Sequence, residues 1–105
     1  MTDVLFVYMT AGDEAEARTI AKALVEKRLA ACVNIIPGMI SVYLWDDQIH
    51  DGQEVVMIAK TVSGKLEALT ETVKDLHSYD CPCIVALPAG GGYAPFLKWV
   101  ENQTA

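Results

Sequence analysis

The densest group of chemically active side chains lies between residues 77 and 83. An imidazole, a phenol, a carboxylate and two thiols occur there within seven residues, from His77, Tyr79, Asp80, Cys81 and Cys83. In an extended backbone, side chains two positions apart point the same way, so Cys81 and Cys83 share a face. Thiolates and imidazoles are ligands for soft or borderline ions such as Cu(I) and Zn(II). The segment therefore predicts a metal site that uses His77, Cys81 and Cys83.

Packing is the competing interpretation for these thiols. A single CxC pair is a weaker metal signature than two paired CxxC knuckles. Small, half-buried cysteines also occur often where a strand begins. Cys32 is embedded in uncharged, apolar sequence, and buried thiols are usually inert. For Cys32, the residues themselves favour packing over a ligand role.

A second group combines aromatic rings with a few charged side chains. Tyr43, Trp45 and Tyr79 provide the aromatic rings, and Glu54, Lys60 and His77 provide the charged or titratable groups. Such a mixture is typical of a small-ligand cleft. Tyrosine and tryptophan are also enriched at protein interfaces. Both interpretations stay open, and a cleft at a subunit interface satisfies both.

Nucleophilic catalysis finds little support in the sequence. There is no GxSxG, and His50 and His77 are the two histidines available as a base. The glycine run at 90–92 is followed by no Lys-Ser/Thr, so it predicts a linker and not a phosphate loop. An acid–base pair of His77 and Asp80 has no nucleophile or cofactor loop beside it. We therefore expect no enzyme, no catalytic residue and no organic cofactor.

Composition excludes further classes. The formal net charge of −6 over 105 residues leaves no positive footprint for nucleic acid. No apolar run is long enough for a membrane helix, and residues 1–4 lack a basic signal region. Three cysteines cannot all pair within one chain, so a reducing, cytoplasmic location is expected. The length predicts a single domain over residues 1–105.

The element on which these groups depend is the uncharged stretch 30–45. It predicts a long strand that bends or bulges at Pro37 and Gly38, because an internal proline and glycine disfavour a helix. Both of its faces are mainly apolar, so it must be covered on both sides. A chain of this size cannot easily provide that cover. The stretch therefore predicts a partner chain.

The remaining segments predict the order of strands and helices along the chain. Strands are expected at 4–9, 55–61 and 83–88, and helices at 13–29, 63–76 and 95–100. Apolar residues recur at helical spacing in the first two helices and predict a buried stripe on each: Ala17, Ile20, Ala21 and Leu24 in the first, and Leu66, Leu69, Val73 and Leu76 in the second. Asp13 and Glu16 predict a capping box, and Ser63 predicts the cap of the second helix. Residues 46–48 (DDQ) predict a turn after the long strand, Ile49 and His50 a short extended piece, and Asp51 with Gly52 a second turn before the third strand. The order β-α-β-β-α-β with an additional helix predicts an α+β, ferredoxin-like sandwich with an antiparallel sheet.

Several segments, in register over nearly the whole chain, resemble the CutA1 divalent-cation tolerance family. They are residues 28–35 (RLAACVNI), Pro37 with Gly38, residues 41–45 (SVYLW), Glu54 with Val55, Lys60 with Thr61, residues 77–82 (HSYDCP), and Tyr93 through Trp99. The resemblance implies a homotrimer similar to the PII signalling proteins. It also implies a non-enzymatic role in tolerance of copper and other divalent ions. The partners expected are further copies of the chain, metal ions and an unidentified protein.

The resemblance also suggests functional positions. It adds Cys32 to His77 as a metal-associated residue and places Trp45, Glu54, Lys60 and Tyr79 in the family's cleft. Asp80 joins this expected cleft, although the family motif His-Pro-Tyr-Glu reads His-Ser-Tyr-Asp here. A ligand role for Cys81 and Cys83 comes from the residues alone. The alternative function is a PII-like sensor or interaction module that binds a small ligand in clefts between subunits.

Overall fold

The computed structural model describes residues 3–105. Its elements are β1 (Val4–Ala11), α1 (Glu14–Glu26), β2 (Cys32–Trp45), β3 (Gln48–Val62), the 3-10 turn η1 (Ser63–Lys65), α2 (Leu66–Leu76), β4 (Ile84–Pro88) and α3 (Ala94–Gln103). The predicted order β-α-β-β-α-β with one further helix is confirmed.

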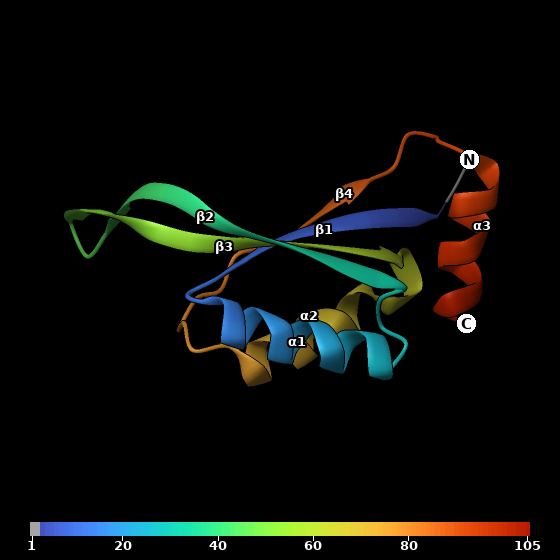
Figure 1. The fold of residues 1–105 in the computed structure, drawn as a ribbon, viewed down its shortest axis with the longest axis horizontal. Coiled ribbons are helices and arrows are strands. Elements are labelled where there is room, and N and C mark those ends of the chain that lie inside the picture. The colour runs from blue at the N-terminus through green and yellow to red at the C-terminus, as the bar shows by residue number, and fades with distance from the viewer. Residues whose placement is uncertain (1–2) are drawn as a thin grey trace.

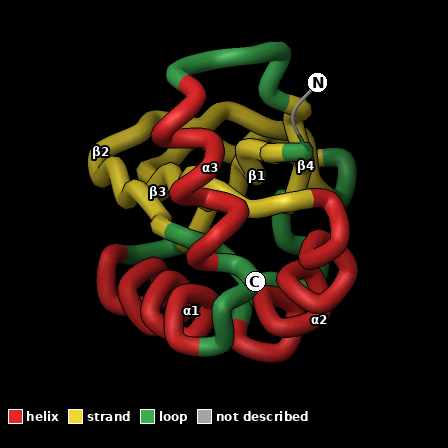
Figure 2. The backbone as a smooth tube through the Cα atoms, turned by 90° about the vertical axis from the view of Figure 1, so that its right-hand side faces the viewer, coloured by secondary structure: helices red, strands yellow, loops and turns green. Residues whose placement is uncertain are grey.

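The four strands form one antiparallel sheet in the order β2-β3-β1-β4. Helices α1 and α2 lie side by side against one face of this sheet, and α3 crosses one end of it (Figures 1 and 2). This is the ferredoxin-like α+β arrangement predicted from the sequence. No helix in the described part of the chain is long and apolar enough to cross a membrane.

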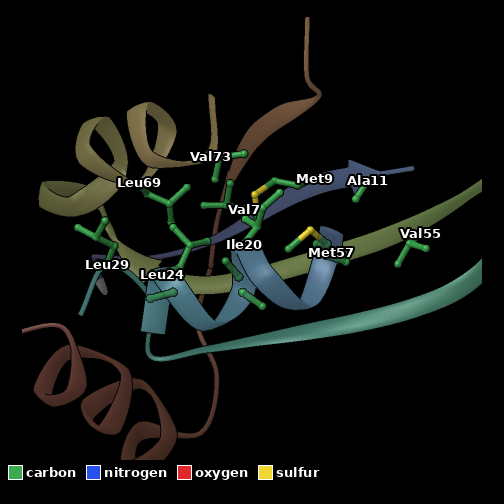
Figure 3. Close-up of a cluster of buried hydrophobic side chains, with 14 residues drawn as sticks. Val7, Met9, Ala11, Ile20, Leu24, Leu29, Val55, Met57, Leu69 and Val73 are labelled. Carbon is green, nitrogen blue, oxygen red and sulfur yellow. The ribbon is translucent and has the colours of Figure 1, made fainter. Parts of the chain in front are cut away.

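The main hydrophobic core lies between the two helices and the inner face of β1 and β3 (Figure 3). The stripe expected on α1 is buried, with Ile20 and Leu24 fully inaccessible to solvent, and Leu69 and Val73 of α2 meet it. Each such side chain contributes about 1.5–3 kcal/mol through removal of apolar surface from water. The strands contribute Val7, Met9, Ala11, Val55, Met57 and Ala59.

The ends of α1 differ slightly from the sequence pattern. Asp13 is the N-cap and accepts a hydrogen bond from the Glu16 backbone N–H at 2.8 Å. The Glu16 carboxylate accepts from the Gly12 N–H at 3.4 Å, one residue before the position a capping box requires. The helix ends at Glu26 and not near residue 29, because Arg28 takes a left-handed φ of 57° and turns the chain.

The expected cap of the second helix by Ser63 is wrong. Ser63 instead begins the 3-10 turn η1, and its hydroxyl donates to the Asp3 carboxylate. No side chain of the described residues caps α2. A 3-10 turn often leads into an α-helix, and here it places the first α-helical residue at Leu66.

Strands β2 and β3 continue beyond the rest of the sheet as a two-stranded arm (Figure 1). Asp46 and Asp47 close it with φ values of 51° and 62°, the left-handed pair of a two-residue hairpin turn. The turn predicted at residues 46–48 is therefore confirmed. The second turn predicted at Asp51 and Gly52 is wrong, since Asp51 pairs with Val42 within the continuous ladder. The chain reverses at Asp46 and Asp47 because aspartate tolerates the left-handed region of backbone conformation.

The predicted bend at Pro37 and Gly38 is confirmed as an irregularity in the ladder. The register between β2 and β3 shifts between Ile36 and Met39, and Gly38 has a φ of 80°. The strand itself begins at Cys32, two residues later than the apolar stretch suggested. A bulge increases the local twist, so it re-aims the arm relative to the rest of the sheet.

Apolar side chains on both faces of the arm are exposed to solvent. Ile40 is 71% and Ile49 78% exposed, and Ile36, Val42 and Leu44 are also exposed. The arm makes the molecule elongated, with a longest extent of 44 Å and a radius of gyration of 14.2 Å. A compact domain of this length has a radius of gyration of roughly 13 Å.

Candidate functional site

A cavity of about 340 Å³ lies where the arm joins the body of the molecule. Three parts of the chain meet there: the arm, the end of β1, and the segment that connects α2 to β4. Its volume is sufficient for a small ligand. The lining residues are Thr10, Tyr43, Trp45, Glu54, Tyr79, Asp80, Cys81 and Cys83. We call this cavity the cleft.

The cleft collects most of the side chains that the sequence singled out. Trp45, Glu54, Tyr79 and Asp80 line it as the expected cleft residues, and both thiols of the CxC pair line it as well. These residues come from segments far apart in the sequence, and the antiparallel pairing of β1 with β3 brings the segments together. The charged side chains among the lining residues, Glu54 and Asp80, are both acidic.

A hydrogen bond between Tyr79 and Glu54 spans the cleft wall. The Tyr79 hydroxyl donates to Oε2 of Glu54 at 2.8 Å, and the Tyr79 ring lies beside Gly12. Burial raises the pKa of the Tyr79 phenol, and the hydrogen bond and the negative charge of Glu54 raise it further. The phenol therefore remains a neutral donor at physiological pH.

His77 lies behind the cleft, with a side chain that is only 1% exposed. Its Nε2 is 2.7 Å from the Thr10 carbonyl oxygen, which can only accept, so Nε2 carries the proton. Its Nδ1 accepts from the Tyr79 backbone N–H at 3.1 Å. Both ring nitrogens are therefore occupied, and the imidazole connects β1 to the segment after α2.

Glu16 holds the same segment from the side of α1. Its carboxylate accepts from the Ser78 backbone N–H at 3.0 Å and lies 3.8 Å from Nδ1 of His77. The sequence indicated only a capping role for Glu16. The signal for this second role was the serine at position 78, because the proline of the family motif has no N–H to donate.

The two thiols of the cleft are free, and they differ in exposure. Cys81 is exposed, whereas Cys83 is partly buried. Burial raises the pKa of the Cys83 thiol, and Glu54 and Cys81 raise it further. Within residues 3–105, no group of three or more His, Cys, Asp or Glu side chains is arranged to hold a metal ion.

Lys60 and Cys32 lie outside the cleft. They are register partners on β3 and β2, further from the arm. The Lys60 ammonium donates to the Asn34 side-chain oxygen and lies 5.5 Å from the centre of the Phe6 ring. Cys32 is partly buried. The structure therefore separates Cys32 and His77 from the thiol pair, and Lys60 from the other expected cleft residues.

Comparison with known proteins agrees with this architecture. Residues 5–103 match the family model described as "CutA1 divalent ion tolerance protein". The chain belongs to the CutA1 family. Its sequence is 48% identical over 98 residues to the "Divalent-cation tolerance protein CutA" of Thermus thermophilus, which covers 93% of this chain and 95% of that protein.

A solved CutA1 structure from Thermus thermophilus superposes with a TM-score of 0.94 at 46% identity, covering 97% of this chain and 99% of that one. Animal and plant relatives are longer than this CutA1 chain. The mouse "Protein CutA" is 45% identical over 97 residues, which are 92% of this chain but 55% of that protein. The chain thus spans about half the length of these relatives. The family names point to a tolerance protein and not to an enzyme.

Proposed function

We propose that this protein acts in divalent-cation tolerance as a non-enzymatic homotrimer that binds copper or another divalent ion in the cleft. The names of the family model and of the Thermus relative support the tolerance role. The observation that carries the binding step is the donor set, in which Glu54, Asp80, Cys81 and Cys83 line one cavity. The free cysteines support a reducing, cytoplasmic setting.

Oxygen and sulfur donors together suit borderline divalent ions such as Zn²⁺ and Cu²⁺. One chain holds no preformed group of three such side chains among its described residues. A stable divalent site normally has four or more ligands. In the proposed trimer, water or side chains of a neighbouring subunit complete the coordination.

Assembly is supported by the uncovered arm. Ile40, Val42, Leu44 and Ile49 form an apolar surface on a two-stranded extension, and an apolar patch of this kind is typical of an interface. Residues of the arm also line the cleft. Covering the arm with a second and a third copy would therefore place neighbouring chains close to the bound ion.

The experiment is a calorimetric titration of metal-free, reduced protein with Zn²⁺, a divalent ion that does not oxidise thiols. We expect saturable binding that Glu54→Gln weakens, because this substitution removes a negatively charged oxygen donor from the cleft. Glu67→Gln is the matched control, since Glu67 is exposed on α2. Equal binding by all three proteins would contradict the cleft as the divalent site.

A PII-like small-ligand sensor is the second candidate. The aromatic wall of Tyr43, Trp45 and Tyr79 favours it. In this case the fluorescence of Trp45 should respond to a metabolite with no metal present. The variant Trp99→Phe removes the other tryptophan, so that the emission reports on the cleft alone. A metabolite screen with no change in fluorescence or in melting temperature would count against a sensor.

A further inference from the structure

We propose that Cys81 and Cys83 form a two-thiolate site for a soft monovalent cation of the Cu(I) or Ag(I) kind, with one ion per chain. This inference rests on the proposed function, because it assigns a second class of ion to the same cleft. It uses only the two thiols among the four donors of the divalent site, and it differs from that site in the charge of the ion and in its independence from a neighbouring subunit.

The placement of the two thiols is the first argument. Both line the cleft, so the shared face expected for alternate residues of an extended segment is present. Pro82 between them restricts its own φ and favours an extended conformation at Cys81. Both thiols are free, with Cys81 exposed and Cys83 partly buried. A pair held in this way loses little conformational freedom when it closes on an ion.

The number of ligands is the second argument. Zinc in proteins is almost always held by four ligands, and no third donor joins these thiols in a preformed group among residues 3–105. Soft thiolates select Cu(I), and monovalent ions of this kind accept two sulfur ligands in a linear arrangement. The described part of the chain thus supplies both of the ligands that a soft monovalent ion needs, but fewer ligands than a divalent ion needs.

The third argument is that the negative charges around the pair attract an incoming cation. The same charges oppose formation of the thiolates, and the positive charge of the bound ion offsets that repulsion. Glu54 and Asp80 line the same cavity, and the lining residues include no cationic side chain. On binding, each thiol releases one proton to solvent and forms one sulfur–metal bond. The two thiolates and the ion then carry one net negative charge. No oxidant or reductant is consumed, since the metal enters in the monovalent state.

The test is a competition for Cu(I) between the reduced protein and the coloured chelator bicinchoninate, under oxygen-free conditions. The competition is needed because a single thiol also binds soft ions, but more weakly than a pair. We expect the unmodified protein to withdraw one Cu(I) per chain from the chelator. Cys81→Ser and Cys83→Ser should each lose this transfer, and Cys32→Ser should retain it.

Thermal unfolding followed by circular dichroism shows whether each variant is folded, and X-ray absorption should show two sulfur neighbours around the copper. Undiminished transfer in the folded double variant Cys81→Ser/Cys83→Ser, or loss in Cys32→Ser, would overturn the proposal. The Zn²⁺ titration separates the two claims. Divalent binding that depends on Glu54, without Cu(I) transfer, refutes the thiolate site alone. Cu(I) transfer without divalent binding refutes the divalent site alone.

Discussion

His77 has the side chain best suited to metal or acid–base chemistry in this chain, yet its surroundings give it a structural role. The Thr10 carbonyl and the Tyr79 N–H occupy its two ring nitrogens. The neutral ring with its proton on Nε2 satisfies both partners, one as acceptor and one as donor. A metal ion would have to displace one of these backbone partners. His77 therefore positions the wall of the cleft.

Replacing His77 should destabilise the fold. We expect His77→Ala to lower the free energy of unfolding by about 2 kcal/mol, because two backbone groups lose their hydrogen-bond partners. Urea denaturation measures the effect. Lys22→Ala is the control, since Lys22 is exposed on α1, and it should change stability by less than about 0.5 kcal/mol. Equal effects of the two substitutions would refute the structural role of His77.

The two cleft thiols should differ in reactivity. At pH 8, we expect iodoacetamide to modify Cys83 more slowly than Cys81, because Cys83 is less exposed and burial and Glu54 raise its pKa. The thiolate is the reactive form, so a raised pKa lowers the rate at a fixed pH. Glu54→Gln removes one cause of the shift and should accelerate the modification of Cys83. Peptide mass spectrometry measures both rates, and faster modification of Cys83 in the unmodified protein would contradict this.

At the scale of elements, the helices, the strand order and the hairpin turn were predictable, but the full length of the hairpin was not. Apolar residues at helical spacing identified α1 and α2, and the proline and glycine identified the bulge in β2. The turn at Asp46 and Asp47 was predicted, but a second turn was predicted at Asp51 and Gly52, because that dipeptide is a strong turn signal. Pairing along the whole arm decides the register, and pairing partners are not visible in a local pattern.

Two glycines test this corrected register. Both Gly38 and Gly52 have open space where a Cβ would lie, and only Gly38 has a positive φ, of 80°. We therefore expect Gly38→Ala to destabilise the protein by about 1 kcal/mol, since an L-residue is strained there. Gly52→Ala should be neutral or stabilise by about 0.5 kcal/mol, because alanine restricts the unfolded chain more than glycine does. Thermal unfolding measures both effects. A marked loss of stability in Gly52→Ala would support a turn at that position.

The residue types of the candidate site could be predicted from the sequence, but which of these residues lie together could not. The sequence indicated Trp45, Glu54, Tyr79 and Asp80 as cleft residues and Cys81 with Cys83 as a pair, and the fold brings all six to one cavity. It did not indicate that Lys60 and Cys32 lie further along the sheet. Residue type suggests a role, but only the register of the strands determines which side chains meet.

At the scale of the molecule, the exposed apolar arm is the surface on which the proposed trimer depends. Multi-angle light scattering should give a mass three times that of one chain. Ile40→Asp should shift the protein toward the monomer, because the substitution places a charge in an apolar interface. Lys22→Asp on the exposed face of α1 is the control and should leave the mass unchanged. A monomeric mass for the unmodified protein would contradict the proposed assembly.

Elemental analysis tests directly whether the cleft of this protein binds a metal ion. The measurement uses protein purified without affinity tags or chelators and compares it with the double variant Glu54→Gln/Cys83→Ser. Retained metal in a fixed ratio to the chain, lost in the variant, is the predicted result. A protein that is metal-free as purified, and that takes up no metal on dialysis against copper or zinc, would contradict metal binding in the cleft.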